Sequence, residues 1–194
     1  MAMSRSRYVA QAGMIAAVHA GFTLVSMLFL QGLAWGPIQL RVSEALTVLA
    51  LFTPAAIPGL TIGTLLANAL AIPIVGAGPI GLLDVVFGSL ATFIGATFTW
   101  RMRTRPLLAL LGPVLANALI VAAYLPILLA AIGFYTIPFT SIELVDSYPL
   151  MYLFGFVAIA LGQTAVVYGL GWPLSRILGR TGLVRRADDG ISAE

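Results

Sequence analysis

Long apolar runs, cut by prolines, glycines and arginines, are the feature that most constrains this sequence. Hydrophobic residues make up 60% of the 194 residues and charged residues only 9%, and the mean hydropathy is +1.04. A soluble domain carries about 25% charged residues. The sequence therefore predicts an all-α integral membrane protein, in which each run of about 20 apolar residues crosses the bilayer as a helix.

Six runs are expected to span the membrane. The first follows Arg5 and Arg7 and is too long for a signal peptide, and it lacks a small-residue cleavage pattern. The second and third form a tight hairpin around Pro58, and residues 76–79 make the next turn. We expect one transmembrane domain over residues 1–180 and a polar cytoplasmic tail over residues 181–194. The expected spans are about Tyr8–Leu30, Ser43–Ala56, Gly59–Val75, Gly81–Trp100, Pro106–Ile132 and Leu150–Leu178.

The arginines predict the orientation of these spans. The chain has 10 basic residues, all arginine. If the amino terminus is cytoplasmic, all of them except Arg41 fall on the cytoplasmic side, as the positive-inside rule requires. Both termini are therefore expected inside the cell, and the polar passage Tyr135 to Asp146, which contains Glu143, is expected outside.

A short polar passage, Gly36 to Glu44, lies between two apolar runs and holds Arg41 and Glu44. Ionisable groups close to lipid are costly and usually functional. The two residues are three positions apart, so they could also simply pair at the start of a helix. Asp84 lies one turn into the fourth span, from the same outer face, and could cap that helix. We expect Glu44 and Asp84 to converge in one outward-facing pocket.

Amides and aromatic residues are weaker candidates. Side-chain amides inside spans more often join helices than bind ligands, which is the role expected of Asn68. For Asn117 and Gln163 both roles stay open, and His19 is expected to be a packing residue. Aromatic residues are expected to anchor the membrane interfaces, although one or two of them could stack on a planar ligand. They are Trp35, Tyr124, Tyr135, Tyr148 and Tyr152.

A stripe of small residues, Ala12, Ala16 and Ala20, lies along one face of the first span. Small residues four apart allow two helices to approach closely. The stripe is expected to be a docking surface for a partner. Internal packing within the same bundle is the alternative.

The sequence lacks the residues that several kinds of chemistry require. The chain has no cysteine and one histidine, so no thiolate or histidine metal site is expected. It has no GxxxxGK[ST] or HExxH motif, so we expect neither nucleotide hydrolysis nor metalloprotease activity. The sequence predicts no enzyme, no catalytic residue and no cofactor.

Three segments carry a family resemblance: Gly36-Pro-Ile-Gln-Leu-Arg-Val-Ser-Glu-Ala-Leu46, Gly81-Leu-Leu-Asp-Val-Val-Phe-Gly-Ser-Leu-Ala-Thr92 and Asn117-Ala-Leu-Ile-Val121. Together they resemble the substrate-binding S components of energy-coupling factor (ECF) transporters, and within them the queuosine-precursor family called QueT. The likeness extends over most of the chain, and the first two segments are fairly specific. The alanine stripe looks like the AxxxA motif with which S components meet their coupling protein.

The resemblance implies a six-helix S component in a prokaryotic cell membrane. It would capture a 7-deazaguanine, such as queuine or its aminomethyl precursor, and work with a coupling protein and two ATPases. A carboxylate of Glu44 or Asp84 can accept two adjacent donors of such a base, and Arg41 can donate to its carbonyl. The other candidate ligand residues are Gln39, Asn117, Gln163 and Trp35.

Other functions stay open. An S component for a pterin or a flavin would use similar acids. An intramembrane enzyme, such as a lipid-modifying transferase or a protease, and a stand-alone channel or exporter are the alternatives from other classes.

Overall fold

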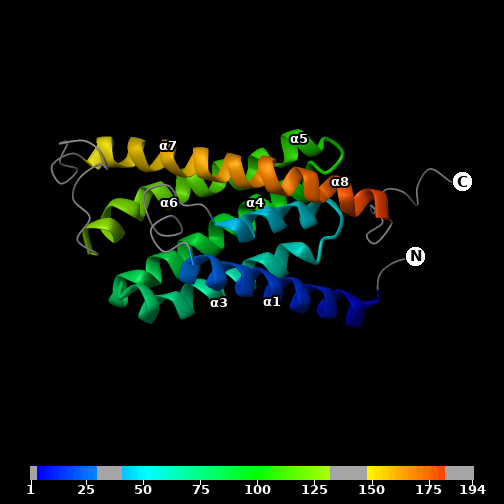
Figure 1. Ribbon diagram of the computed structural model, residues 1–194, viewed down its shortest axis with the longest axis horizontal. Coiled ribbons are helices and arrows are strands. Elements are labelled where there is room, and N and C mark those ends of the chain that lie inside the picture. The colour runs from blue at the N-terminus through cyan, green and yellow to red at the C-terminus, as the bar shows by residue number, and fades with distance from the viewer. Residues whose placement is uncertain (1–3, 30–40, 132–147, 182–194) are drawn as a thin grey trace, which may run out of the picture.

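The computed structural model of the chain describes residues 4–29, 41–131 and 148–181. Every regular element in these ranges is helical, and the long helices lie roughly side by side (Figure 1). The elements are α1 (Arg5–Phe29), the 3₁₀ helix η1 (Val42–Leu51), α3 (Ala56–Val75), the 3₁₀ turn η2 (Gly78–Gly81), the π-helix η3 (Asp84–Gly88), α4 (Ser89–Arg101), α5 (Pro106–Ala109), α6 (Leu111–Ala131), α7 (Tyr148–Val166), the π-helix η4 (Val167–Gly171) and α8 (Trp172–Thr181).

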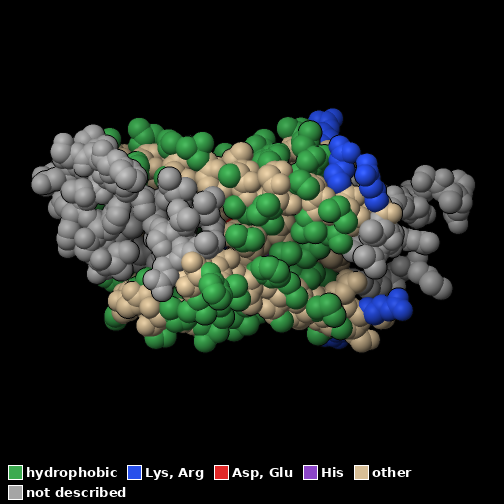
Figure 2. Space-filling view, in the orientation of Figure 1, with side chains coloured by type: hydrophobic (Ala, Val, Ile, Leu, Met, Phe, Trp, Pro, Cys, Tyr) green, Lys and Arg blue, Asp and Glu red, His purple; other side chains and the backbone are tan. Residues whose placement is uncertain are grey.

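Within the described residues, five helical stretches are long and apolar enough to cross a membrane, and they match five of the six predicted spans. Large hydrophobic side chains such as Phe29, Val86 and Leu161 are exposed on their outer faces, as lipid-facing residues are. Figure 2 shows hydrophobic side chains spread over the side of the molecule. The all-helical membrane fold is therefore confirmed. The stretches are Arg5–Phe29, Ala56–Val75, Gly78–Arg101, Pro106–Ile127 and Tyr148–Arg180.

The second predicted span is the exception. Instead of an α-helix over residues 43–56, the chain forms the 10-residue 3₁₀ helix η1, and Ala56 already begins α3. At a rise of about 2 Å per residue, η1 is about 20 Å long, shorter than the roughly 30 Å hydrocarbon core. Its residues are mostly buried, and it contacts α1, α4, α7 and η4. The prediction was wrong in helix type and length because η1 is packed among other helices, with only Val42, Leu46 and Leu49 partly exposed.

η1 runs antiparallel to α1. The Thr23 and Ser43 hydroxyls are hydrogen-bonded, with 2.7 Å between their oxygens, near the start of η1. The Thr53 hydroxyl donates to Gln11 Oε1 at 3.2 Å, just after η1 ends. The chain therefore returns through η1 to the end of the bundle at which α1 begins, and α3 starts from there (Figure 1).

α1 and α3 pack closely through small residues. A Cβ atom at Gly59 would lie 2.8 Å from the Ala12 carbonyl oxygen, and one at Gly63 would lie 2.8 Å from the Ala16 carbonyl oxygen. Ala12, Ala16 and Ala20 are all buried. The stripe predicted to dock a partner is therefore covered within the chain. Its geometry is that of the internal-packing alternative, because glycine on α3 brings the two backbones together.

Basic residues gather at one end of the bundle. Figure 2 shows blue side chains at the end where α1 begins and α8 ends (Figure 1). The exposed residues there include Arg5, Arg7, Arg101, Arg105 and Arg180. This segregation is the pattern that the positive-inside rule associates with a cytoplasmic face.

Candidate substrate-binding site

Arg41 joins two distant parts of the chain. It directly precedes η1 and is only 6% exposed. Its Nη2 lies 2.9 Å from Oδ2 of Asp84, the first residue of η3, and this ion pair is buried. The simple pairing of Arg41 with Glu44 within one helix is therefore wrong. The structure instead brings the two predicted segments together, as the converging-pocket prediction requires.

Both side-chain oxygens of Asp84 and its backbone carbonyl oxygen accept hydrogen bonds. Its Oδ2 accepts from Arg41, and its Oδ1 accepts from the Tyr124 hydroxyl at 2.6 Å. Its backbone carbonyl accepts from Asn68 Nδ2 at 2.8 Å, which is the helix-joining role predicted for Asn68. A Cβ at Gly88 would lie 2.9 Å from that Nδ2, so glycine leaves room for these contacts. Asp84 thus ties together η1, α3, η3 and α6 through side-chain bonds, and it does not serve as a simple helix cap.

The role of Tyr124 was not predicted. It was expected to anchor the interface, but it is 6% exposed and its hydroxyl binds a buried carboxylate. The signal in the sequence is weak: a tyrosine inside an apolar span needs a partner for its hydroxyl when it is buried. Tyr148 behaves more like an anchor, since it is 53% exposed and stacks on Tyr152 with 6.5 Å between ring centroids.

Glu44 differs from Asp84 because it is only half paired: no hydrogen bond reaches its Oε2. It is 2% exposed, and the side chain of Gln163 on α7 lies close to its carboxyl group. Glu44 Oε2, Gln163 Oε1 and Arg41 Nε are buried and have no hydrogen-bond partner. A buried polar atom without a partner costs about 1–3 kcal/mol. A ligand that supplied donors to the two oxygens and an acceptor to the guanidinium would recover that cost.

Arg41 lies near two acids. Its guanidinium is within electrostatic range of Glu44 and Asp84 and is bonded to the second. A carboxylate at Glu44 has no bonded counter-charge of its own, so a ligand cation beside it would be stabilising.

The other sequence candidates fall into two groups. Asn117 is buried but donates to the Pro113 carbonyl at 3.1 Å within its own helix α6, so its amide is engaged outside the Arg41–Asp84 cluster. Gln39 and Trp35 lie outside the described residues, as do Tyr135, Glu143 and Asp146. The structure therefore brings together Arg41, Glu44, Asp84 and Gln163 from the predicted set, and adds Tyr124.

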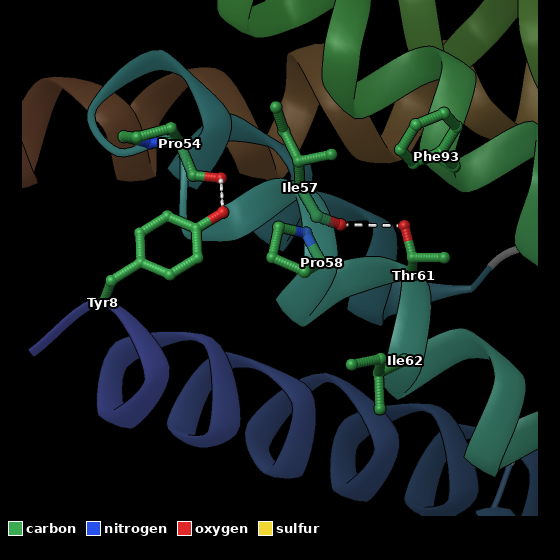
Figure 3. A pocket seen from close by; sticks show the side chains of 7 residues that line it. All are labelled: Tyr8, Pro54, Ile57, Pro58, Thr61, Ile62 and Phe93. Carbon is green, nitrogen blue, oxygen red and sulfur yellow. Dashed lines mark hydrogen bonds between the residues drawn. The ribbon is translucent and has the colours of Figure 1, made fainter. Parts of the chain in front are cut away.

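A surface groove of about 450 Å³ lies elsewhere, between the start of α1, the first turns of α3 with the turn before it, and α4 (Figure 3). Figure 3 shows the Tyr8 phenol reaching over Pro54 at one end and the Phe93 ring at the other. Apart from the Tyr8 and Thr61 hydroxyls, its side chains are apolar, so it lacks the charged groups that a polar base would need. The lining residues are Tyr8, Pro54, Ile57, Pro58, Thr61, Ile62 and Phe93.

Comparison with known families identifies a match over most of the chain. The family model described as QueT transporter matches residues 9–180, which run from α1 into the last turn of α8. No curated protein and no solved structure matches the chain. Among the described residues, no group of three or more acidic, histidine or cysteine side chains could hold a metal ion.

Proposed function

Because the chain belongs to the QueT transporter family, we propose that it is the S component of an ECF-type importer and captures a queuosine precursor outside the cell. The substrate is a 7-deazaguanine that carries an amine, such as queuine or its aminomethyl precursor. The observation that carries this proposal is the half-paired Glu44, buried beside Gln163 and the Arg41–Asp84 ion pair.

The unpaired atoms match the hydrogen-bonding edge of such a base. A deazaguanine has an N1–H and an exocyclic amine as adjacent donors, and Gln163 Oε1 can accept from one of them. The carbonyl oxygen beside the N1–H suits Arg41 Nε. The ammonium group of the substituent projects from the other ring, past the carbonyl, and Glu44 Oε2 can accept from it in a charge-assisted bond.

In this proposal the two acids have different tasks. Asp84 is held by Arg41 and Tyr124, so it fixes the guanidinium in place. Glu44 contacts the ligand. This changes the expectation that both carboxylates bind the base directly.

Energy comes from partners in this proposal. A coupling protein and two ATPases would power import, and the coupling protein would meet α1 on its exposed side. Gly13, Ala17 and Gly21 form a second small-residue stripe there, and a Cβ at Gly13 or Gly21 would have no neighbour within 4 Å. Small residues spaced by four allow close helix contact in lipid.

Matched leucine substitutions test this docking face. Ala17→Leu is expected to prevent co-purification with the coupling protein while leaving ligand binding unchanged. Ala16→Leu, one position earlier but buried against α3, is expected to lower the melting temperature instead. Normal assembly of Ala17→Leu would rule out this face.

We place the arginine-rich end in the cytoplasm of a prokaryotic cell and the Arg41–Glu44 end towards the outside. Cysteines introduced singly into this cysteine-free chain should react with an impermeant reagent from outside at Ser141 and not at Thr104. The reverse labelling would overturn the orientation.

Mass spectrometry of small molecules that co-purify with the detergent-solubilised chain tests the function itself. A 7-deazaguanine is the expected result. A pterin or flavin would assign the chain to another vitamin, and a modified lipid would indicate an enzyme. Transport by the purified chain alone in liposomes would indicate a channel or exporter.

A further inference from the structure

The single histidine of the chain is buried without a hydrogen-bond partner. His19 is 1% exposed, and both Nδ1 and Nε2 lack a partner. A neutral imidazole has one donor and one acceptor nitrogen, so two polar atoms are unsatisfied in one side chain. Leucine would fill a similar volume without this cost, so packing alone does not account for histidine here.

His19 lies next to the proposed site. Its backbone carbonyl accepts from the Thr23 hydroxyl at 2.8 Å, and the same hydroxyl lies 2.7 Å from Ser43 Oγ. Ser43 sits between Arg41 and Glu44 in the sequence, and the Arg41 guanidinium is within electrostatic range of the imidazole. α3 packs against the Cβ atom of His19, since a Cβ at Gly63 would lie 3.0 Å from it.

We propose that His19 is a further ligand-contacting residue, of which one ring nitrogen forms a hydrogen bond with the bound base. This inference rests on the proposed function. The base then contacts α1 as well as η1 and α7. The hydrogen bond to the base offsets part of the cost of burying the imidazole, which links its burial to recognition.

Calorimetry with 7-(aminomethyl)-7-deazaguanine on the detergent-solubilised full chain tests the proposal. His19→Leu is expected to bind at least about tenfold more weakly than the wild type, because the hydrogen bond to the base is lost. Its melting temperature without ligand should equal or exceed that of the wild type, because no bond is lost in the empty protein. His19→Gln, which retains a donor and an acceptor, should recover part of the affinity.

Thr99→Val is the matched control. The Thr99 hydroxyl is buried and bonds the carbonyls of Gly95 and Ala109 near the arginine-rich end. This variant should lower the melting temperature and leave the affinity unchanged.

The outcomes distinguish a wrong role for His19 from a wrong proposed function. If the wild type binds the probe and His19→Leu binds it equally well, the role of His19 is wrong while the proposed function stands. A lower melting temperature of ligand-free His19→Leu, with unchanged affinity, would likewise make His19 a packing residue. If the wild type does not bind the probe at all, the proposed function fails.

Discussion

Two buried carboxylates in one cluster have different surroundings. Asp84 has both side-chain oxygens bonded, to Arg41 and Tyr124, and its carbonyl is bonded to Asn68. Glu44 is buried to a similar extent but leaves Oε2 without a partner, and its neighbour Gln163 leaves Oε1 without one. Burial is similar, so the difference lies in how fully each acid is paired.

This difference separates a structural acid from a binding acid. A paired buried charge is expensive to disturb, because removing one partner leaves the other uncompensated. A half-paired charge costs stability in the empty protein and gains most when a complementary ligand arrives. Variants of Asp84 should therefore lose stability, whereas variants of Glu44 should lose ligand binding.

The largest expected effect is on stability at Asp84. Asp84→Asn leaves the Arg41 guanidinium buried without its carboxylate, at a cost of about 3–5 kcal/mol, and should strongly lower the thermal unfolding temperature in detergent. The double variant Arg41→Met with Asp84→Leu removes both charges and should regain much of that loss. Equal unfolding temperatures for Asp84→Asn and the wild type would contradict the structural role.

Tyr124→Phe should have a smaller effect of the same kind. It removes one hydrogen bond to a charged acceptor, worth about 1.5–3 kcal/mol, and keeps the ring packing. Differential scanning calorimetry of ligand-free protein measures this loss. Tyr148→Phe is the control, because the Tyr148 hydroxyl bonds a backbone carbonyl and its side chain is exposed. A similar effect of the two variants would mean that Tyr124 does not support Asp84.

The smallest effect is expected at Asn117. Its amide bonds the Pro113 carbonyl inside α6, so Asn117→Leu should change the affinity for the deazaguanine by less than about twofold. Isothermal titration beside the wild type measures it. A tenfold loss of affinity would return Asn117 to the ligand-binding set.

The fold was largely predictable because lipid imposes a simple requirement. Apolar runs cut at prolines, glycines and arginines gave the five long stretches with closely matching ends. A short helix was predicted at η1, but its interior position was not, because hydropathy cannot distinguish a helix that faces lipid from one that other helices surround. The 3₁₀ geometry of residues 42–51 depends on those neighbours.

The charged residues of the site could be predicted from the sequence, but their hydrogen-bond partners could not. Arg41, Glu44 and Asp84 are conspicuous because ionisable groups are rare in this chain. Their partners come from distant segments: Tyr124 lies 40 positions from Asp84, and Gln163 lies on α7. The alanine stripe shows the same limit, since its spacing indicates close helix packing but does not identify α3 as the neighbour.

The most direct test of the account is the charge preference of the wild type and Glu44→Gln. Binding of 7-(aminomethyl)-7-deazaguanine is compared by calorimetry with binding of the neutral base 7-deazaguanine. The wild type should prefer the amine by at least about thirtyfold, because a buried charge-assisted pair contributes on the order of 2 kcal/mol or more. Glu44→Gln should lose this preference while its unfolding temperature stays close to that of the wild type. An unchanged preference in folded Glu44→Gln would contradict the account, because the acid that receives the ligand's charge would then have to be another one.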